Sequence, residues 1–149
     1  MPLSDALADP ALRTRLLDAC VRALEEEVEG KRGISGMAIR SGYAAFQKVQ
    51  PGIARSAFER LLPLFAPAIE PCWCEAQASG SPNAWFEQHA GEVADALLGV
   101  TDAQAARAKN QALATLYRSL RGMARPHVIA AVPRLPGVLA VVSPDQPVV

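Results

Sequence analysis

The chain has 149 residues, half of them apolar and a fifth charged, and fifteen cationic side chains balance fifteen acidic ones. This composition is typical of a globular protein with one domain. It does not favour a nucleic-acid-binding protein, because such proteins usually carry a net positive charge.

Three features indicate where the protein works. The opening residues, MPLSDALADP, include two aspartates and no cation, so we expect no signal peptide. No window approaches the ~20 apolar residues that a membrane span needs. Three cysteines, an odd number, are typical of reduced thiols. We therefore expect a cytoplasmic protein that does not enter the membrane.

Two helices are predicted before the first proline-rich segment. Asp9-Pro10 combines an N-cap with a proline in the first turn, and apolar residues then recur every three or four positions, so we expect a helix over 10–29. Ser35 caps a second helix over 35–49. That helix is apolar on almost every side, so we expect it in the middle of the molecule.

Gly42 lies inside this small-residue central helix. A glycine in a helix interior costs about 1 kcal/mol relative to alanine. We expect it to offset that cost by letting another helix come close.

A short third helix should begin at Ile53, with Arg55, Glu59 and Arg60 on its outside. Prolines then stand at positions 63, 67 and 71, and each removes a helical N–H and presses on the carbonyl four residues back. We therefore expect a break near residues 62–64 and a kinked, proline-broken segment over 63–72.

Further helices are predicted in the second half. Ser81-Pro82 opens one helix, and Thr101 to Gln104 form a capping box that should open another, ending near Met123. Arg125-Pro126 should start one more, interrupted at Pro133. Residues 135–142 form either a helical turn or a docked extended piece, and residues 143–149 form a loose tail.

The pattern as a whole predicts an all-α fold. Helix and turn alternate, and no convincing period-two run indicates a strand. We expect a compact bundle of six to seven helices, folded as a single domain over residues 1–142.

Charge is distributed in alternating blocks. Residues 1–30 hold seven acids and three bases, 31–60 one acid and six bases, 61–102 six acids alone, and 103–134 six bases alone. Acidic and basic helices could pack beside each other, where an exposed ion pair contributes ~0–1 kcal/mol. Alternatively, the two basic blocks could converge on one cationic surface that binds an anionic partner.

Two anion-binding candidates follow from these blocks. GKRGISG, at residues 30–36, precedes a helix N-terminus, where free N–H groups attract anions. It lacks the strand and the Lys-Ser/Thr pair of a P-loop, so an interhelical turn is the simpler interpretation. On a later helix, three arginines share one face. The candidate residues are Lys31, Arg32, Gly33, Ser35, Gly36, Arg118, Arg121 and Arg125.

A partner groove is a second candidate site. The proline-broken segment and the helix after it carry large apolar side chains that could leave a groove for a partner helix or peptide. These residues are Leu64, Phe65, Ile69, Trp73, Trp85 and Phe86.

We assign no catalytic residue, metal or cofactor. A structural zinc needs four well-spaced ligands, and Cys72 and Cys74 could be joined only by His89 and His127. A hydrolase would need a positioned nucleophile beside one of these histidines, and no serine or cysteine lies in a recognisable elbow.

Several local patterns resemble a known group of proteins. They are GISG before a helix containing Tyr43, KVQPG at 48–52, LLPLF at 61–65, EPCW at 70–73, ADALLGVTDA at 94–103, LYRSLRG at 116–122 and HVIAAVPRL at 127–135. The sequence resembles an uncharacterised family of small helical proteins from high-GC bacteria, a domain of unknown function. The resemblance implies an all-α fold and carries over no catalytic residue.

Three functions are compatible with the sequence. The first is a non-catalytic module that binds a protein partner or self-associates. The second is an anion or nucleic-acid binder that uses the two basic blocks, with Arg40, Lys48 and Arg55 adding to the first block. The third is a small enzyme or carrier for an apolar metabolite.

Overall fold

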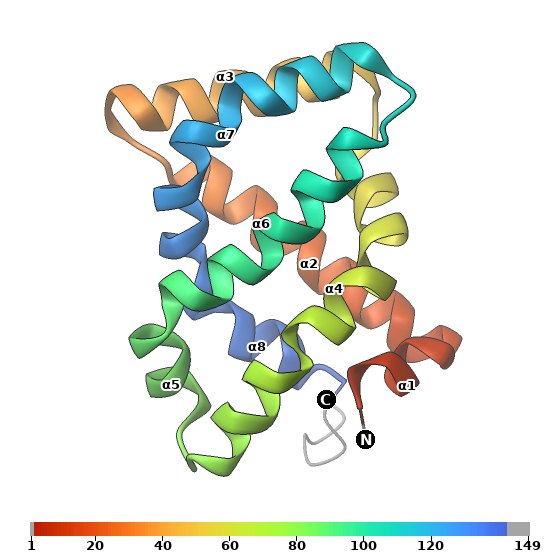
Figure 1. Ribbon diagram of the computed structural model, residues 1–149, viewed down its shortest axis with the longest axis vertical. Coiled ribbons are helices and arrows are strands. Elements are labelled where there is room, and N and C mark those ends of the chain that lie inside the picture. Colours follow the sequence, from red (N-terminus) through yellow and green to blue (C-terminus); the bar gives the residue numbers. More distant parts are fainter. Residues whose placement is uncertain (1, 143–149) are drawn as a thin grey trace.

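Residues 2–142 are described in this computed structural model, and every regular element among them is helical (Figure 1). The elements in chain order are α1 (Leu3–Ala8), α2 (Pro10–Gly30), α3 (Gly33–Val49), α4 (Ile53–Ala78), α5 (Pro82–Gln88), α6 (Ala90–Ala106), α7 (Gln111–Ala131), the 3-10 turn η1 (Val132–Arg134) and α8 (Leu135–Ala140). The predicted all-α bundle is confirmed. The predicted tail, residues 143–149, lies outside the described residues.

The first predicted cap is present. Asp9 Oδ1 accepts hydrogen bonds from the backbone N–H groups of Ala11 and Leu12, at 2.9 and 3.3 Å. Pro10 occupies the first position of α2, where its missing N–H removes no helical bond. This short sequence signal therefore sets the start of the helix.

The predicted helix start at Thr101 is wrong. α6 runs without interruption from Ala90 to Ala106, and the Thr101 hydroxyl donates to the Leu98 carbonyl at 3.0 Å instead of capping a new helix. Asn110 caps α7. The alanine-rich sequence around Thr101 favours helix, and this preference outweighs the local capping signal.

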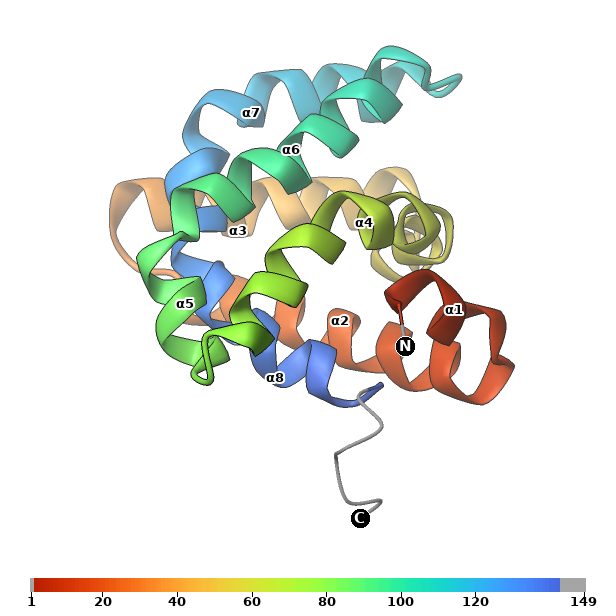
Figure 2. The ribbon, with the colours of Figure 1, turned by 60° about the horizontal axis from the view of Figure 1, so that its bottom comes forward.

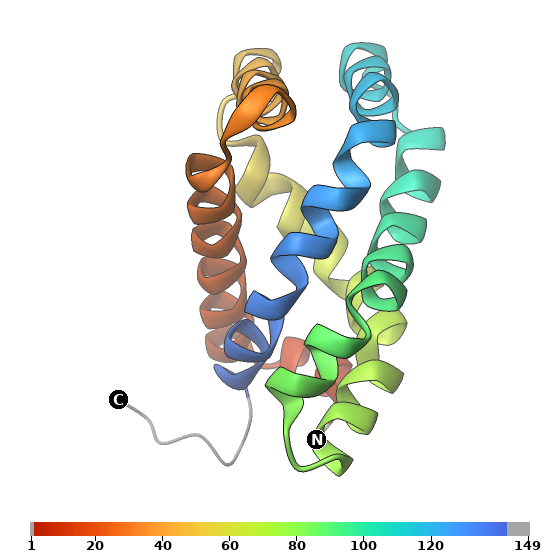
Figure 3. The ribbon, with the colours of Figure 1, turned by 90° about the vertical axis from the view of Figure 1, so that its left-hand side faces the viewer.

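The predicted break at the prolines is also wrong. α4 continues through Pro63, Pro67 and Pro71, and all three rings are exposed. Prolines four residues apart share a helix face, so the carbonyls that lose their donors face water rather than the core. The helix bends instead of breaking. Its first and second parts run in different directions (Figures 1 and 3).

The core surrounds the second part of α4. Phe86 is fully buried, and its ring lies 5.5 Å from that of Trp85, edge to face, and 6.1 Å from that of Trp73. α1 is held against this region by a hydrogen bond of 2.8 Å from the Leu3 N–H to the Glu70 carboxylate. These contacts join α1, α4 and α5.

α3 lies at the edge of the bundle and not in its middle, so that prediction is wrong. Ile34 is 91% exposed and Met37 62% exposed. Figure 3 shows α3 and the start of α7 at one end of the molecule, and the two helices pack against each other.

The predicted close approach at Gly42 is confirmed, because a Cβ there would lie 2.5 Å from Leu120 Cδ1 on α7. Because α3 packs on α7 through small residues such as Gly42, it is covered on that side and exposed on the other.

Candidate functional site

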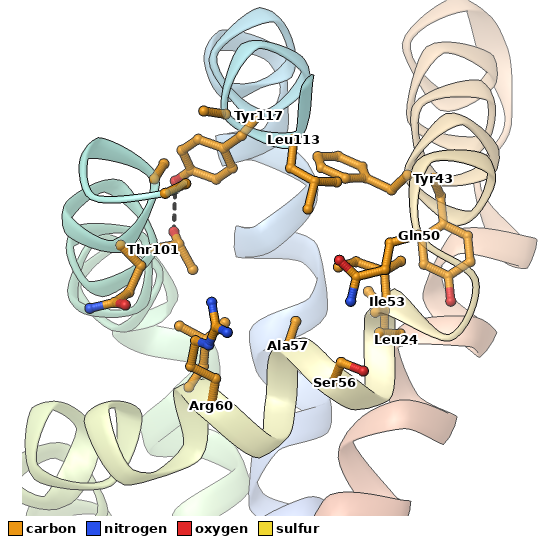
Figure 4. A pocket seen from close by; sticks show the side chains of 17 residues that line it. Leu24, Tyr43, Gln50, Ile53, Ser56, Ala57, Arg60, Thr101, Leu113 and Tyr117 are labelled. Carbon is orange, nitrogen blue, oxygen red and sulfur yellow. Dashed lines mark hydrogen bonds between the residues drawn. The ribbon is translucent and has the colours of Figure 1, made fainter. Parts of the chain in front are cut away.

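A pocket of about 330 Å³ lies between α3, the first part of α4, and the facing sides of α6 and α7 (Figure 4). Figure 2 shows α6 and α7 running along each other above α4. The lining residues are Leu24 from α2, Tyr43, Phe46 and Gln50 from α3 and its end, Ile53, Ala54, Ser56, Ala57, Arg60 and Leu61 from α4, Thr101, Gln104, Ala105 and Ala108 from α6 and the residues after it, and Leu113, Ala114 and Tyr117 from α7. This volume lies within the range of small-molecule sites, ~300–1,000 Å³.

Short side chains leave this space open. Five lining residues are alanines: Ala54, Ala57, Ala105, Ala108 and Ala114. Alanine favours helix, yet it projects only a methyl group into the space between helices. The same residues that stabilise the helices therefore leave a mainly apolar pocket unfilled.

A hydrogen-bond network joins α6 to α7 at one side of the pocket. The Tyr117 hydroxyl donates to Asp102 Oδ1 at 2.5 Å and lies 2.7 Å from the Thr101 hydroxyl, a contact drawn in Figure 4. Arg121 donates to both oxygens of Asp102, at 2.8 and 3.2 Å. Burial, together with the hydrogen bond to Asp102, raises the pKa of Tyr117 to about 12. Tyr117 therefore stays a neutral donor at ordinary pH.

Among the described residues, Arg60 is the only charged one that lines the pocket. Figure 4 shows its side chain rising from α4 toward the pocket, and the residue is exposed to solvent. None of the ion pairs among residues 2–142 involves Arg60. By contrast Arg55, one turn earlier on α4, pairs with Asp18 at 2.7 Å. The pocket thus combines apolar walls with one cation that lacks an acidic partner in the described part of the chain.

The predicted anion loop has its polar groups engaged within the chain. Lys31 pairs with Glu27 at 3.0 Å, and Arg32 donates to the carbonyls of Glu29 and Lys31. Ser35 Oγ lies 3.1 Å from a ring nitrogen of His127. The two glycines shape the turn, since Gly33 has a φ of 78° and a Cβ on Gly36 would lie 2.9 Å from the Lys31 backbone.

The three predicted arginines of α7 do not join that loop. Arg121 and Arg125 pair with acids of α6, whereas the loop meets α7 at His127, on another side of the helix. Arg118 donates only to the Thr115 hydroxyl, at 3.5 Å. The structure therefore does not bring the two groups of predicted anion-binding residues together.

Most of these ion pairs join an acidic block to a basic block. The pairs are Asp18–Arg55, Glu26–Arg134, Glu27–Arg134, Glu27–Lys31, Asp95–Arg125 and Asp102–Arg121. This arrangement favours the first interpretation of the charge pattern, in which acidic and basic helices pack beside each other. The arginines concerned are turned toward their partners within the chain.

The predicted partner groove is largely core. The exposed fractions of Ile69, Trp73, Trp85 and Phe86 are 4%, 7%, 8% and 0%. Phe65 is half-buried, and only Leu64 is appreciably exposed, at 38%. The four buried side chains contact one another and their neighbours in the core, so they cannot line a surface groove.

The histidines and cysteines do not form a reactive cluster. The His89 ring stacks on Trp85 with centroids 4.0 Å apart, and its Nδ1 lies 2.8 Å from the Trp85 carbonyl oxygen. Burial raises the pKa of the Cys20 thiol to about 12, and a hydrogen bond to Glu70 raises the pKa of Cys74. Within residues 2–142, no three potential metal ligands come together.

Sequence reasoning missed the pocket as a unit. It placed Arg60 on the outside of its helix, and Arg60 is indeed exposed, but it did not show that Arg60 lines a pocket together with Tyr43 and Phe46 of α3. The available signal was the recurrence of alanine in three helices. That signal could not show which alanines face one another across a gap.

Comparison with known proteins identifies a family. The model of a family described as "Family of unknown function (DUF6918)" matches residues 3–142, so the chain belongs to this family. No curated protein and no solved structure is significantly similar to it. None of the helices described here has the length and apolar composition required to cross a bilayer.

Proposed function

We propose that the protein binds a small, mainly apolar ligand in the pocket between α3, α4, α6 and α7, as a carrier or sensor rather than as an enzyme. The observation that supports this proposal is the pocket itself. The pocket offers about 330 Å³ of space that is open to solvent and lined mainly by apolar side chains. A small molecule can therefore enter it and bury apolar surface there, which favours binding.

The chemistry of the lining residues favours binding over catalysis. None of the seventeen carries a carboxylate, an imidazole or a thiol. Such groups serve as the general bases that activate hydroxyl nucleophiles, and no described lining residue provides one for the hydroxyls of the pocket. The Tyr117 hydroxyl donates to Asp102, and burial together with this hydrogen bond raises its pKa. The pocket can therefore hold and orient a molecule without an activated nucleophile among its lining residues.

Binding of 1-aminonaphthalene, an uncharged apolar fluorophore small enough for this volume, tests the proposal. We expect saturable fluorescence enhancement at one site. Ala105→Phe fills the pocket and should abolish it, whereas Ala103→Phe, at an exposed position of the same helix, should not. Both variants should first be shown to keep the far-UV circular dichroism of the wild type. Absence of saturable binding, or equal binding by the two variants, would refute the proposal.

The three free cysteines lead us to place this activity in the cytoplasm. Secretion tests the placement. A fusion to a reporter that is active only after export should stay inactive, and an active reporter would contradict it.

The exposed end of α3 favours a second candidate function, the binding of a protein partner. Ile34 and Met37 are exposed one turn apart. α3 and α7 carry cations and no acid, and no ion pair of the described residues involves Arg40 or Lys48. Such a face suits an acidic amphipathic helix better than a second copy of itself, because two copies would bring like charges together.

Analytical ultracentrifugation and cross-linking in lysate test this candidate. We expect a monomer, with a cross-linked partner that is lost in the double variant Ile34→Ser/Met37→Ser and kept in Arg60→Gln. A dimer that the double variant dissociates would show that the face binds a second copy. An unchanged cross-linking pattern would remove the candidate altogether.

A further inference from the structure

We propose that the ligand of the pocket is an amphipathic anion, a carboxylate on a medium-length apolar chain, and that Arg60 binds the carboxylate. This inference rests on the proposed function and names the class of ligand. Its three supports, all drawn from the described residues, are the unpaired cation that lines the pocket, the absence of an acidic lining residue, and the shape of the pocket.

The first support is electrostatic. The paired arginines among the described residues on α4 and α7 bond carboxylates of neighbouring helices, as Arg55 does with Asp18 and Arg121 does with Asp102. Arg60 is exposed and has no such pair in residues 2–142. A guanidinium presents a planar fork of N–H donors that matches a carboxylate. A ligand carboxylate would therefore give Arg60 the ionic partner that it lacks among the described residues.

The second support is the absence of a competing charge in the pocket. No lining residue is acidic. The carboxylate of Asp102, which follows the lining residue Thr101 in the chain, is engaged by Arg121 and Tyr117, and both lower its pKa. Glu59, the sequence neighbour of Arg60, lies 3.9 Å from Arg55. An incoming anion thus meets a cation and no free acid along the lining.

The third support is shape. Apolar side chains, including Leu113 and Ile53, face the same space as the Arg60 guanidinium (Figure 4). The pocket volume is about 330 Å³. One water molecule occupies ~30 Å³ in the liquid, so at one non-hydrogen atom per such volume the pocket holds roughly a dozen of them. A ten-carbon carboxylate fits this estimate, and its chain would lie against the alanines of α4, α6 and α7.

Isothermal titration calorimetry with two matched probes tests the assignment. Decanoate and decan-1-ol share a chain and differ in the charge of the head. We expect the wild type to bind decanoate about tenfold more tightly than decanol, consistent with a partly exposed charge-assisted hydrogen bond. Arg60→Gln should remove this difference while leaving decanol binding unchanged. Arg60→Lys should retain part of it.

Arg55→Gln provides the control, because Arg55 lies on the same helix outside the pocket lining and is exposed. It should bind both probes as the wild type does. Equal binding of decanoate by the wild type and by Arg60→Gln would overturn the inference and leave the pocket proposal standing. Failure of both probes to bind the wild type would overturn the pocket proposal as well.

Discussion

The close contact between α3 and α7 predicts that Gly42→Ala destabilises the wild type but stabilises a variant in which Leu120 has been shortened. In the wild type a Cβ on Gly42 would lie 2.5 and 3.0 Å from the two Cδ atoms of Leu120. Replacing an interior glycine by alanine gains about 1 kcal/mol of helix propensity. Overpacking typically costs about 1–3 kcal/mol. Gly42→Ala should therefore lower the free energy of unfolding by about 0–2 kcal/mol.

The same substitution should be stabilising once Leu120 is shortened. In a Leu120→Ala background the obstructing atoms are absent, so Gly42→Ala should raise the free energy of unfolding by about 1 kcal/mol. The coupling energy between the two positions is then about 1–3 kcal/mol. Urea unfolding followed by tryptophan fluorescence measures it, because Trp73 and Trp85 lie in the core.

Gly99 supplies the control for this cycle. It lies inside α6, it is exposed, and a Cβ there would meet nothing within 4 Å. Gly99→Ala should stabilise the protein by about 1 kcal/mol in both backgrounds. If Gly42→Ala also stabilised both backgrounds equally, α3 would not approach α7 at Leu120 and the described packing would be refuted.

Three further predictions test the core, the network and the prolines. Phe86→Ala should cost about 3–5 kcal/mol of unfolding free energy in urea, because the ring is fully buried; a cost below 1 kcal/mol would contradict its place in the core. The pKa of Tyr117 is raised from 10.0 to about 12, so the stability that its protonated form provides is complete below pH 10 and lost as pH rises from 10 to 12. Tyr117→Phe should flatten that decline in unfolding free energy, and an unchanged slope would count against the hydrogen bond to Asp102. Pro67→Ala should raise the melting temperature, because an N–H is restored on an exposed helix face at a gain of up to about 3 kcal/mol; a lower melting temperature would show that the bend needs this proline.

Local signals in the sequence predicted what depends on neighbouring residues. The Asp9 cap was read correctly because a cap and its recipients lie within three residues. Gly42 was read correctly because an unfavourable glycine inside a helix needs a close neighbour to offset it. The all-α class followed from the hydrophobic periodicity, which each helix carries in its own sequence.

The errors arose where tertiary context decides the outcome. The prolines of α4 predict a break, but the helix continues through them with a bend because their rings are exposed and the affected carbonyls face water. The apolar character of α3 suggested a central position, yet small side chains allow it to pack on one side only. Arg60 has the same sequence character as Arg55, and only the fold shows that one lines a pocket and the other pairs with Asp18.

An NMR titration of the ¹⁵N- and methyl-labelled protein with decanoate tests the central claim most directly. The pocket predicts saturable shift changes at the lining alanines, among them Ala57, Ala105 and Ala114, and at the Arg60 side chain. Shifts confined to Ile34 and Met37 on the exposed end of α3, or no saturable shifts at all, would contradict it.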